Sequence, residues 1–238
     1  FCINSIRDSI LNEIIESDLR NRNGYRYSDL GFYLMRELIE EKTGTDIEKY
    51  VDSVFYTPLG AKTMGYNPLQ RFSETEIVPT ENDQIFRKQR LRGYVHDQGA
   101  AMLGGVSGHA GIFSNSLDLA KMMQMFLNKG QYGDHQYISE ETLQLFTSPL
   151  NNPYENRRGI GFDKPVPDNP GTLGPACISS SSNSFGHAGF TGILAWADPE
   201  TDLIYIFISN RLYPDMENRE LIKLNTRTNI QEVFYNAI

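Results

Sequence analysis

The chain has 238 residues, of which 39% are hydrophobic and 22% charged, a composition ordinary for a globular protein with an apolar core. The formal net charge is −8 and no Lys/Arg run occurs, which argues against nucleic acid as a partner. Cys2 and Cys177 are too few for a disulfide framework or a cysteine-rich zinc site, and no apolar run is long enough to span a membrane. Because the sequence opens at Phe1 without a methionine, we expect it to be a piece of a longer chain.

Several segments carry apolar residues at helical spacing, together with start and stop signals. From these patterns we expect helices over residues 5–20, 30–42, 46–55, 96–103, 116–127, 139–146 and 217–237. Ser28, Ser116 and Ser139 stand where N-caps are expected, because a serine hydroxyl accepts a hydrogen bond from the first turn. Gly44 is expected to end the second helix.

Two apolar runs near the C-terminus, 193–197 and 203–208, predict strands. Only a tight turn separates them, so they must pair antiparallel. Upstream, the proline- and serine-rich residues 149–184 predict loops around one short strand at 159–162. Residues 61–95 are irregular and polar, and we interpret them as a long surface excursion of the kind that can form a functional lid.

This order of elements predicts an α+β fold. Residues 1–150 form a mainly helical region, and residues 151–238 contribute an antiparallel sheet with the last helix packed on it. We expect both regions to belong to one folded domain that is truncated at its N-terminus.

Two short stretches become informative together. Tyr27-Ser28-Asp29 lies at the start of a predicted helix, and His187-Ala188-Gly189 lies on a predicted sheet strand. This pairing resembles the penicillin-recognising serine hydrolases, which include serine β-lactamases, DD-peptidases and related esterases. Their signature is Ser-x-x-Lys, then Tyr-x-Asn or Ser-x-Asn, then Lys-Thr-Gly, for which several relatives carry His-x-Gly.

The resemblance covers essentially the whole chain. The stretches that follow the family in order are residues 27–32, 55–60, 95–97, 104–114 and 190–199. The sequence is most similar to the β-lactamase-related domain fused behind family 3 glycoside hydrolases in bacterial envelope proteins. The resemblance implies the C-terminal part of a β-lactamase/transpeptidase-like fold and a periplasmic or lipid-anchored location.

The resemblance assigns Tyr27 the role of the base that takes a proton from the nucleophilic serine. A serine hydroxyl is a weak nucleophile until a neighbour does so, and a phenol can serve when nearby cations lower its pKa. Asp29 takes the place of the family's asparagine, which contacts the substrate amide. An ionised carboxylate cannot donate a hydrogen bond, so Asp29 argues against lactam-type amide binding.

On the last motif, His187 replaces the family's lysine and carries a charge only when it is protonated. The resemblance places Ala188 and Gly189 beside the substrate. It makes the Phe190 N–H one donor of an oxyanion hole, and such a donor is worth roughly 3 kcal/mol.

His96, Asp97 and His109 suggest a metal site, but their spacing matches no compact zinc pattern and no cysteine lies near them. We interpret them as residues that order loops near the rim of a cleft. We therefore expect neither a metal nor another cofactor.

The Ser-x-x-Lys motif is absent, since no serine is followed by lysine three positions later. The nearest miss is Ser17 with Arg20, and an arginine cannot lose a proton to act as a base. We predict that the nucleophile lies upstream of Phe1 and that this fragment alone is inactive. We also predict an exposed sheet edge, covered by the upstream segment of the same protein or by a second copy in a homo-oligomer.

Three functions remain open. The first is a serine hydrolase that acts through an acyl-enzyme on an ester, amide or peptidoglycan-type small-molecule or cell-wall substrate. The second is a non-catalytic module that binds cell-wall fragments beside a glycoside hydrolase. The third is a Ser-His-Asp hydrolase that pairs His187 with a local serine such as Ser180.

Overall fold

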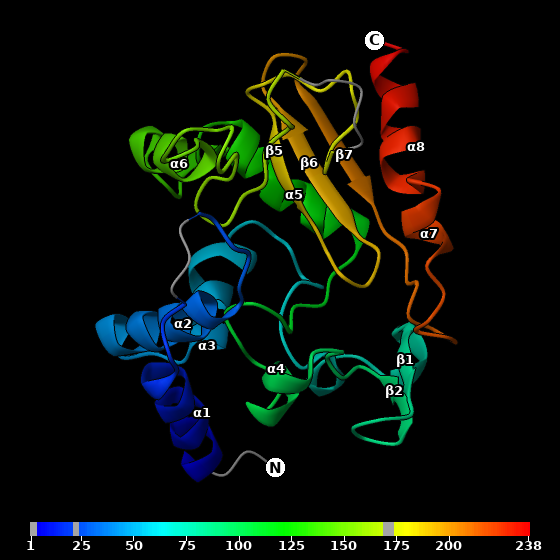
Figure 1. Cartoon of the computed structure of the whole chain (residues 1–238). Coiled ribbons are helices and arrows are strands. Elements are labelled where there is room, and N and C mark those ends of the chain that lie inside the picture. The colour runs from blue at the N-terminus through cyan, green and yellow to red at the C-terminus, as the bar shows by residue number, and fades with distance from the viewer. Residues whose placement is uncertain (1–3, 21–23, 169–173) are drawn as a thin grey trace. The chain divides into compact units, whose positions relative to one another are not determined.

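The computed structural model describes residues 4–20, 24–168 and 174–238, and the chain divides into two compact units with their boundary between Ser114 and Asn115 (Figure 1). In the first unit the helices are α1 (Asn4–Glu16), α2 (Leu30–Thr43), α3 (Ile47–Val51) and α4 (Gln98–Met102). A π-helical turn (Asp52–Tyr56) continues α3, and two 3-10 turns (Pro68–Gln70 and Glu74–Glu76) precede the antiparallel hairpin of β1 (Pro79–Asp83) and β2 (Gln89–Arg92).

Helix α2 begins at Leu30 and is ended by Gly44, as the sequence predicts. Gly44 adopts the left-handed conformation at φ +64° and its N–H donates to Glu40 O at 2.9 Å. The predicted cap at Ser28 is wrong by one position, because Asp29 occupies the N-cap. The Ser28 hydroxyl still accepts a hydrogen bond from Leu30 N at 3.3 Å. A shift of one residue is within the fraying expected of helix ends.

The prediction that residues 61–95 form an irregular surface loop is wrong for the β1-β2 hairpin, which is regular and has buried side chains. Glu81 and Asp83 on β1 are only 4% and 5% exposed, and Leu91 on β2 is 1% exposed. Carboxylates are buried here because Arg87 bridges them, with Nη2 3.0 Å from Glu81 Oε1 and Nε 3.0 Å from Asp83 Oδ2. An ion-paired core has no apolar periodicity, so the hydrophobic pattern could not predict it.

The second unit contains the antiparallel sheet. Its strands are β5 (Phe185–Ala188), β6 (Leu194–Asp198) and β7 (Leu203–Phe207), hydrogen-bonded in the order β5-β6-β7. The remaining elements are α5 (Ser116–Leu127), the short pair β3 (Gln131–Tyr132) and β4 (His135–Gln136), α6 (Glu140–Thr147), α7 (Glu220–Lys223) and α8 (Thr226–Tyr235). The two predicted C-terminal strands are confirmed as an antiparallel pair. The strand predicted at 159–162 is wrong, since only an isolated bridge forms, between Asp163 and Gly186.

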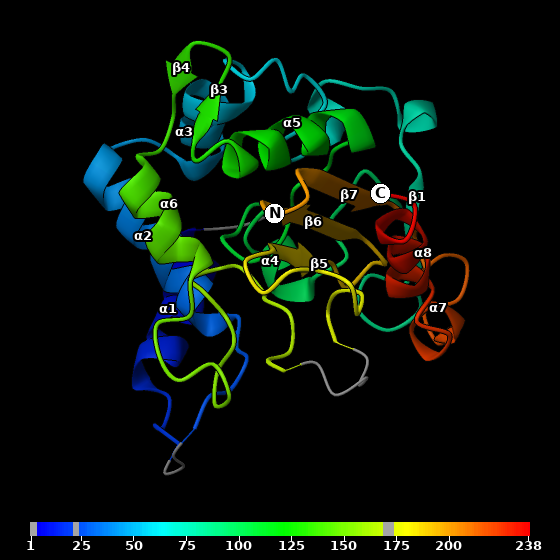
Figure 2. The same cartoon turned by 90° about the horizontal axis from the view of Figure 1, so that it is seen from above.

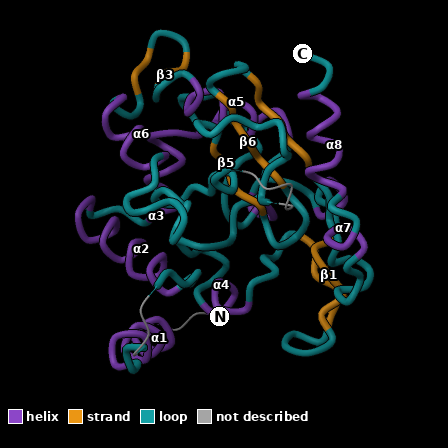
Figure 3. Tube along the Cα trace, turned by 45° about the horizontal axis from the view of Figure 1, so that its top comes forward, coloured by secondary structure: helices purple, strands orange, loops and turns teal. Residues whose placement is uncertain are grey.

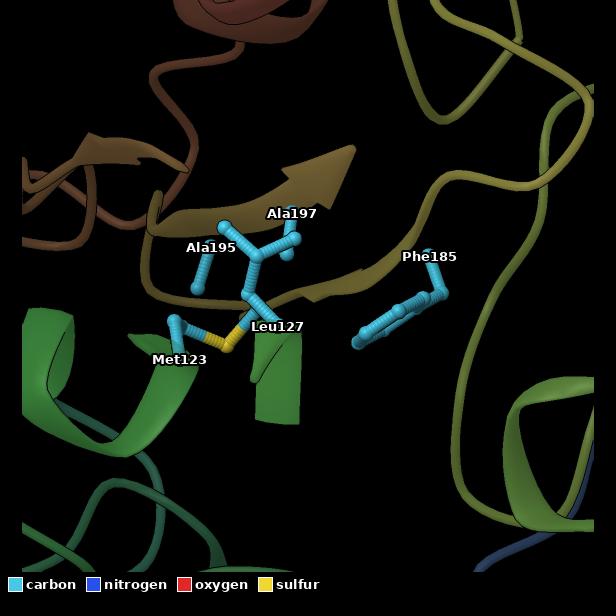
Figure 4. Close-up of a cluster of buried hydrophobic side chains, with 5 residues drawn as sticks. All are labelled: Met123, Leu127, Phe185, Ala195 and Ala197. Atoms are coloured by element: carbon cyan, nitrogen blue, oxygen red, sulfur yellow. The ribbon is translucent and has the colours of Figure 1, made fainter. Parts of the chain in front are cut away.

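One face of this sheet packs against α5 (Figure 4). Met123 and Leu127 project from the helix onto Phe185, Ala195 and Ala197. The two alanines alternate along β6 and therefore point to the same face. The small side chains let the helix approach closely, which makes this the apolar core of the second unit.

The other face carries α8, as Figures 1 and 2 show for the two sides of the sheet. Tyr205 on β7 lies 5.8 Å from Phe234, measured between ring centroids, and its hydroxyl donates to Arg227 O at 2.9 Å. The predicted packing of the last helix on the sheet is confirmed. That helix is not continuous, because Asn225 adopts the left-handed conformation at φ +48° and separates α7 from α8 (Figure 3).

The two serine caps predicted in this unit have different outcomes. Ser139 caps α6 as expected, with its hydroxyl accepting from Thr142 N at 3.2 Å. For α5, Asn115 is the cap in place of Ser116, and its side-chain oxygen accepts from Asp118 N at 2.9 Å. Across the described residues, no helix combines the length and apolar character needed to cross a bilayer.

Candidate active site

The Tyr27-Ser28-Asp29 motif lies at the entrance to α2. Tyr27 is 51% exposed and immediately precedes the helix, while Asp29 occupies its N-cap. The Asp29 carbonyl accepts from Phe32 N at 2.9 Å and so starts the helical ladder. The half-exposed Tyr27 therefore lies two residues before the N-cap of α2.

The glycine-rich loop of residues 104–111 packs directly against this part of α2. A Cβ atom at Gly108 would lie 2.1 Å from Phe32 O, so only glycine allows the two backbones to approach this closely. Arg36 on the same helix donates from Nη1 to Val106 O at 2.7 Å. The His109 ring stacks on Tyr33 with 4.3 Å between centroids. The structure therefore joins two of the stretches that carry the family resemblance.

His109 lies at the centre of a hydrogen-bonded relay. Its Nε2 is 2.8 Å from Asp97 Oδ1, and its Nδ1 is 2.9 Å from the Ser107 hydroxyl. The hydrogen bond from His109 is the main cause that holds the pKa of the Asp97 carboxyl below its usual value. The ionised carboxylate can only accept, so Nε2 carries a hydrogen and donates it to Asp97.

This relay has the connectivity of a Ser-His-Asp triad, but Ser107 is only 1% exposed. A substrate carbonyl cannot reach a hydroxyl that is enclosed in this way. Asp97 also accepts from Ala100 N at 2.7 Å and caps α4. We therefore assign the relay to ordering the loop, which is the role that the sequence favoured for Asp97 and His109.

His96 belongs to a different cluster. Its Nδ1 is 2.9 Å from Glu81 Oε1, and its carbonyl accepts from Arg87 Nη2 at 2.8 Å. His96 is therefore part of the polar core of the β1-β2 hairpin. In residues 4–20, 24–168 and 174–238, no three His, Cys, Asp or Glu side chains converge as a metal site would require.

His187 lies on β5, where the family resemblance places it. Its Nδ1 is 2.9 Å from Ala188 O, and a carbonyl can only accept, so Nδ1 carries the hydrogen. Arg158 Nη1 lies 3.0 Å from Nε2 and donates to it. Arg158 therefore brings a permanent positive charge next to this strand.

Sequence reasoning missed an arginine pair, Arg157 and Arg158, of which Arg158 contacts His187. Arg157 and Arg158 both bind the carboxylate of Asp163, with closest distances of 2.9 and 2.7 Å. Asp163 is 3% exposed and pairs with Gly186 on β5 through both main-chain hydrogen bonds. Two guanidinium groups against one carboxylate leave this cluster net positive. Two adjacent arginines were the available signal, but such a pair is usually a solvated surface feature.

Ala188 ends β5, and Gly189 opens the turn to β6 with its N–H donating to Ile193 O at 2.9 Å. The Phe190 side chain is 65% exposed and lies under the Arg211 guanidinium, whose carbon is 4.3 Å from the ring centroid. The main-chain groups of Phe190 are therefore presented on a turn at the end of two strands.

Three hydroxyls of the serine-rich loop donate to acceptors other than His187. Ser180 donates to Cys177 O at 2.7 Å, Ser181 to Asp198 at 2.5 Å and Ser184 to Ser181 O at 2.7 Å. Each contact anchors the loop. The interpretation in which His187 activates a local serine therefore has no support from this geometry.

Each unit thus gathers its own part of the candidate site. In the first unit, the Tyr27 motif, Asp97 and His109 converge around the start of α2. In the second, the His187 motif and Phe190 lie on the β5-β6 hairpin, and Arg158 contacts His187 from an upstream loop.

A family model described as Beta-lactamase matches residues 10–228. An Escherichia coli protein named "Putative D-alanyl-D-alanine carboxypeptidase" is 34% identical to this chain over 201 residues. The match covers 78% of this chain and 44% of that protein. The chain therefore spans less than half the length of this curated relative.

Solved structures show the same fold at low identity. Unliganded simvastatin synthase from Aspergillus terreus is 17% identical with a TM-score of 0.62, covering 98% of this chain and 62% of that one. A penicillin-binding protein homologue from Caulobacter crescentus is 16% identical with a TM-score of 0.56, covering 87% and 59%. With a family match over most of its length and a helical region followed by an antiparallel sheet, this chain belongs to the β-lactamase family.

Proposed function

We propose that this chain is the C-terminal part of a serine hydrolase that cleaves peptides ending in a free carboxylate, through an acyl-enzyme. The observation that carries the proposal is the guanidinium of Arg158, 3.0 Å from His187 Nε2 on the strand that holds the His-Ala-Gly motif. An arginine binds a carboxylate through two parallel N–H donors, which gives both charge and orientation.

The catalytic steps assign one task to each motif. A serine supplied by an upstream segment attacks the substrate carbonyl, and Tyr27 accepts the serine proton and passes it to the leaving amine. The Phe190 N–H stabilises the negative charge that develops on the carbonyl oxygen. Water then attacks the acyl-enzyme, releasing the shortened peptide and restoring the serine. The present chain lacks a Ser-x-x-Lys motif, so this fragment alone is expected to be inactive.

The charge of the cluster around His187 favours a carboxylate-ended peptide over a neutral ester. Arg157 and Arg158 outnumber the single carboxylate of Asp163. The name of the curated relatives, putative D-alanyl-D-alanine carboxypeptidase, supports this substrate class. A carboxypeptidase removes a residue that bears a terminal carboxylate. Such a cell-wall substrate would place the protein in the bacterial envelope.

An upstream segment would also complete the sheet. Strand β7 is an edge strand in the sheet that the described residues form. Ile204 and Ile206 on this strand line an open groove of about 620 Å³ together with residues of α5. A strand from the upstream segment would pair with this edge and cover the groove.

The test compares two substrates that differ only in charge, using the longer protein that includes the upstream segment. One is a peptide ending in D-alanyl-D-alanine, and the other is the same peptide with a C-terminal amide. We expect a preference for the acid, and we expect Arg158→Met to lower kcat/KM for the acid roughly 10- to 100-fold while leaving the amide nearly unchanged.

Arg157→Met is the matched control, because Arg157 shares Asp163 but donates to Lys164 O in place of His187. It should reduce the preference for the acid much less. Equal hydrolysis of acid and amide by the unmodified protein would refute the proposed substrate class. Binding of cell-wall fragments without turnover would instead favour the non-catalytic module.

A further inference from the structure

The turn between β5 and β6 is held by donors on each of its five carbonyls. Two main-chain bonds close the turn, from Gly192 N to Gly189 O at 3.0 Å and from Gly189 N to Ile193 O at 2.9 Å. Arg211 donates from Nε to Phe190 O and from its main-chain N to Thr191 O, both at 2.9 Å. Arg227 Nη1 donates to Ile193 O at 2.9 Å and to Gly189 O at 3.4 Å, and Ser209 Oγ donates to Gly192 O at 2.8 Å. A short surface turn does not need this many side-chain donors to form.

Arg211 holds the turn through three different parts of the residue. Its main-chain N–H donates to Thr191 O, its Nε donates to Phe190 O, and the plane of its guanidinium covers the Phe190 ring at 4.3 Å. The Phe190 side chain is 65% exposed, so this stack restrains a ring that solvent would otherwise leave mobile.

Arg227 reaches the same turn from α8. A single nitrogen, Nη1, contacts both Ile193 O and Gly189 O, with the shorter distance to Ile193. Gly192 closes the turn at φ +119°, and a Cβ there would lie 2.5 Å from the Ser209 hydroxyl. The helix, the strand and the turn are therefore locked together at this point.

Two arginines side by side are an unfavourable way to hold a turn. Burial lowers the pKa of the Arg227 guanidinium, and the charge of Arg211 lowers it further. Neutral donors could satisfy the same carbonyls without this repulsion, as Ser209 does for Gly192. The arrangement therefore points to a requirement on the turn beyond its folding.

That requirement follows from peptide geometry. In a trans peptide the N–H points opposite to the preceding carbonyl, so holding Gly189 O sets the direction of the Phe190 N–H. We propose that Arg211 and Arg227 are positioning residues that fix the β5-β6 turn for catalysis. Arg227 contacts Gly189 O and so directs the Phe190 N–H away from its own guanidinium, as an oxyanion donor, while Arg211 holds the carbonyls of Phe190 and Thr191. This inference rests on the proposed function for the role of that N–H, while the restraint on the turn stands on the contacts alone.

The first experiment requires no catalysis. Amide hydrogen exchange of residues 189–193, measured on the present chain by two-dimensional NMR, should accelerate at least 10-fold in Arg211→Met and Arg227→Met if the arginines restrain the turn. Arg219→Met is the matched control, because Arg219 is an exposed arginine and the hydrogen bonds described for the turn come from Arg211 and Arg227 in its place. It should leave the exchange rates unchanged.

Lysine substitutions separate geometry from charge and avoid the loss of a buried cation. Arg227 uses one nitrogen, so Arg227→Lys should keep most of the restraint. Arg211 uses Nε and a planar face, which lysine lacks, so Arg211→Lys should loosen the turn almost as much as Arg211→Met. Similar exchange rates in Arg211→Lys and the unmodified chain would overturn the assignment.

The second experiment measures turnover in the longer protein. Arg211→Lys should lower kcat roughly 10- to 100-fold with little change in KM, because a misaligned oxyanion donor is lost only in the transition state. Loosened exchange with an unchanged kcat would overturn the positioning role. If the unmodified protein turns over no substrate, the proposed function fails. The exchange rates then decide the restraint: acceleration supports it and unchanged rates overturn it.

Discussion

The sheet of the second unit and the hairpin of the first both contain buried residues, yet different interactions stabilise them. Around β6, the contacts are apolar: Met123 and Leu127 pack on Ala195 and Ala197 (Figure 4). Around β1, the centre is the Arg87 guanidinium, which reaches two carboxylates and two main-chain carbonyls. The packing around β6 depends on the volume of the side chains, whereas the network around β1 depends on the direction of hydrogen bonds and on charge.

This difference predicts opposite tolerance to conservative substitution. Apolar packing is non-directional, so a residue of similar volume can replace another with little loss. A buried ion-pair network depends on each donor reaching its acceptor, and removing one partner leaves the others buried and uncompensated. Each of the following substitutions tests one side of the comparison, beginning with the largest expected effect.

The largest effect is expected at Arg87. Glu81 and Asp83 have only 5% of their side-chain surface exposed, so Arg87→Met should lower the free energy of unfolding of the hairpin by roughly 3–5 kcal/mol. Arg87→Lys should rescue little of this, because a point charge cannot replace contacts made from Nε and both Nη atoms. Hydrogen exchange of the hairpin amides, read by mass spectrometry, measures the change.

Arg90→Met provides the control on the neighbouring strand. Arg90 has 56% of its side-chain surface exposed and lies 4.0 Å from Glu74, a surface pair that contributes little. Its exchange pattern should match that of the unmodified chain. A lysine at position 87 that fully restores protection of the hairpin would contradict the directional account.

The same contrast explains which parts of the fold could be predicted from the sequence. Strands β6 and β7 were predicted because their apolar runs follow the period of a buried sheet. The β1-β2 hairpin was missed because its buried residues are Glu81, Asp83 and Arg87, whose pattern is that of a surface loop. The break at Asn225 was missed because a single left-handed residue leaves no trace in apolar periodicity.

The candidate site also has parts that could be predicted from the sequence and parts that could not. The Tyr27 and His187 motifs are contiguous in sequence, so their positions on α2 and β5 could be predicted. The relay from Ser107 through His109 to Asp97 and the contact of Arg158 with His187 join separate segments. Such pairings depend on how loops fold back, which neither composition nor spacing specifies.

In the apolar core, the expected effect is smaller and depends on volume. Met123 is 4% exposed, so Met123→Ala should lower the free energy of unfolding of the second unit by roughly 2–4 kcal/mol. Met123→Leu keeps the volume and should cost less than about 1.5 kcal/mol. The fluorescence of Trp196, the only tryptophan in the sequence and 1% exposed, reports unfolding of this unit in denaturant. Equal losses for leucine and alanine would contradict the packing account.

The smallest effect is expected at Lys164, a buried charge within the second unit. Its side chain donates to Asn183 O at 2.9 Å, and burial lowers the pKa of its ammonium to about 8, against the opposing attraction of Asp198. In the unfolded chain the pKa returns to roughly 10.4. Between these values the unfolded chain binds a proton that the folded chain has released, so this lysine contributes stability that rises with pH.

The free energy of unfolding of the unmodified chain, relative to Lys164→Met, should therefore increase on the order of 1 kcal/mol from about pH 7.5 to about pH 9.5. Trp196 fluorescence in a denaturant series at each pH measures it. Lys223→Met is the control, because Lys223 has 66% of its side-chain surface exposed and should show no such trend. A difference that is flat or falls with pH would mean that Lys164 keeps its proton in the fold. The second unit would then accommodate a buried charge as the hairpin of the first unit does, and the contrast between the two regions would be one of degree.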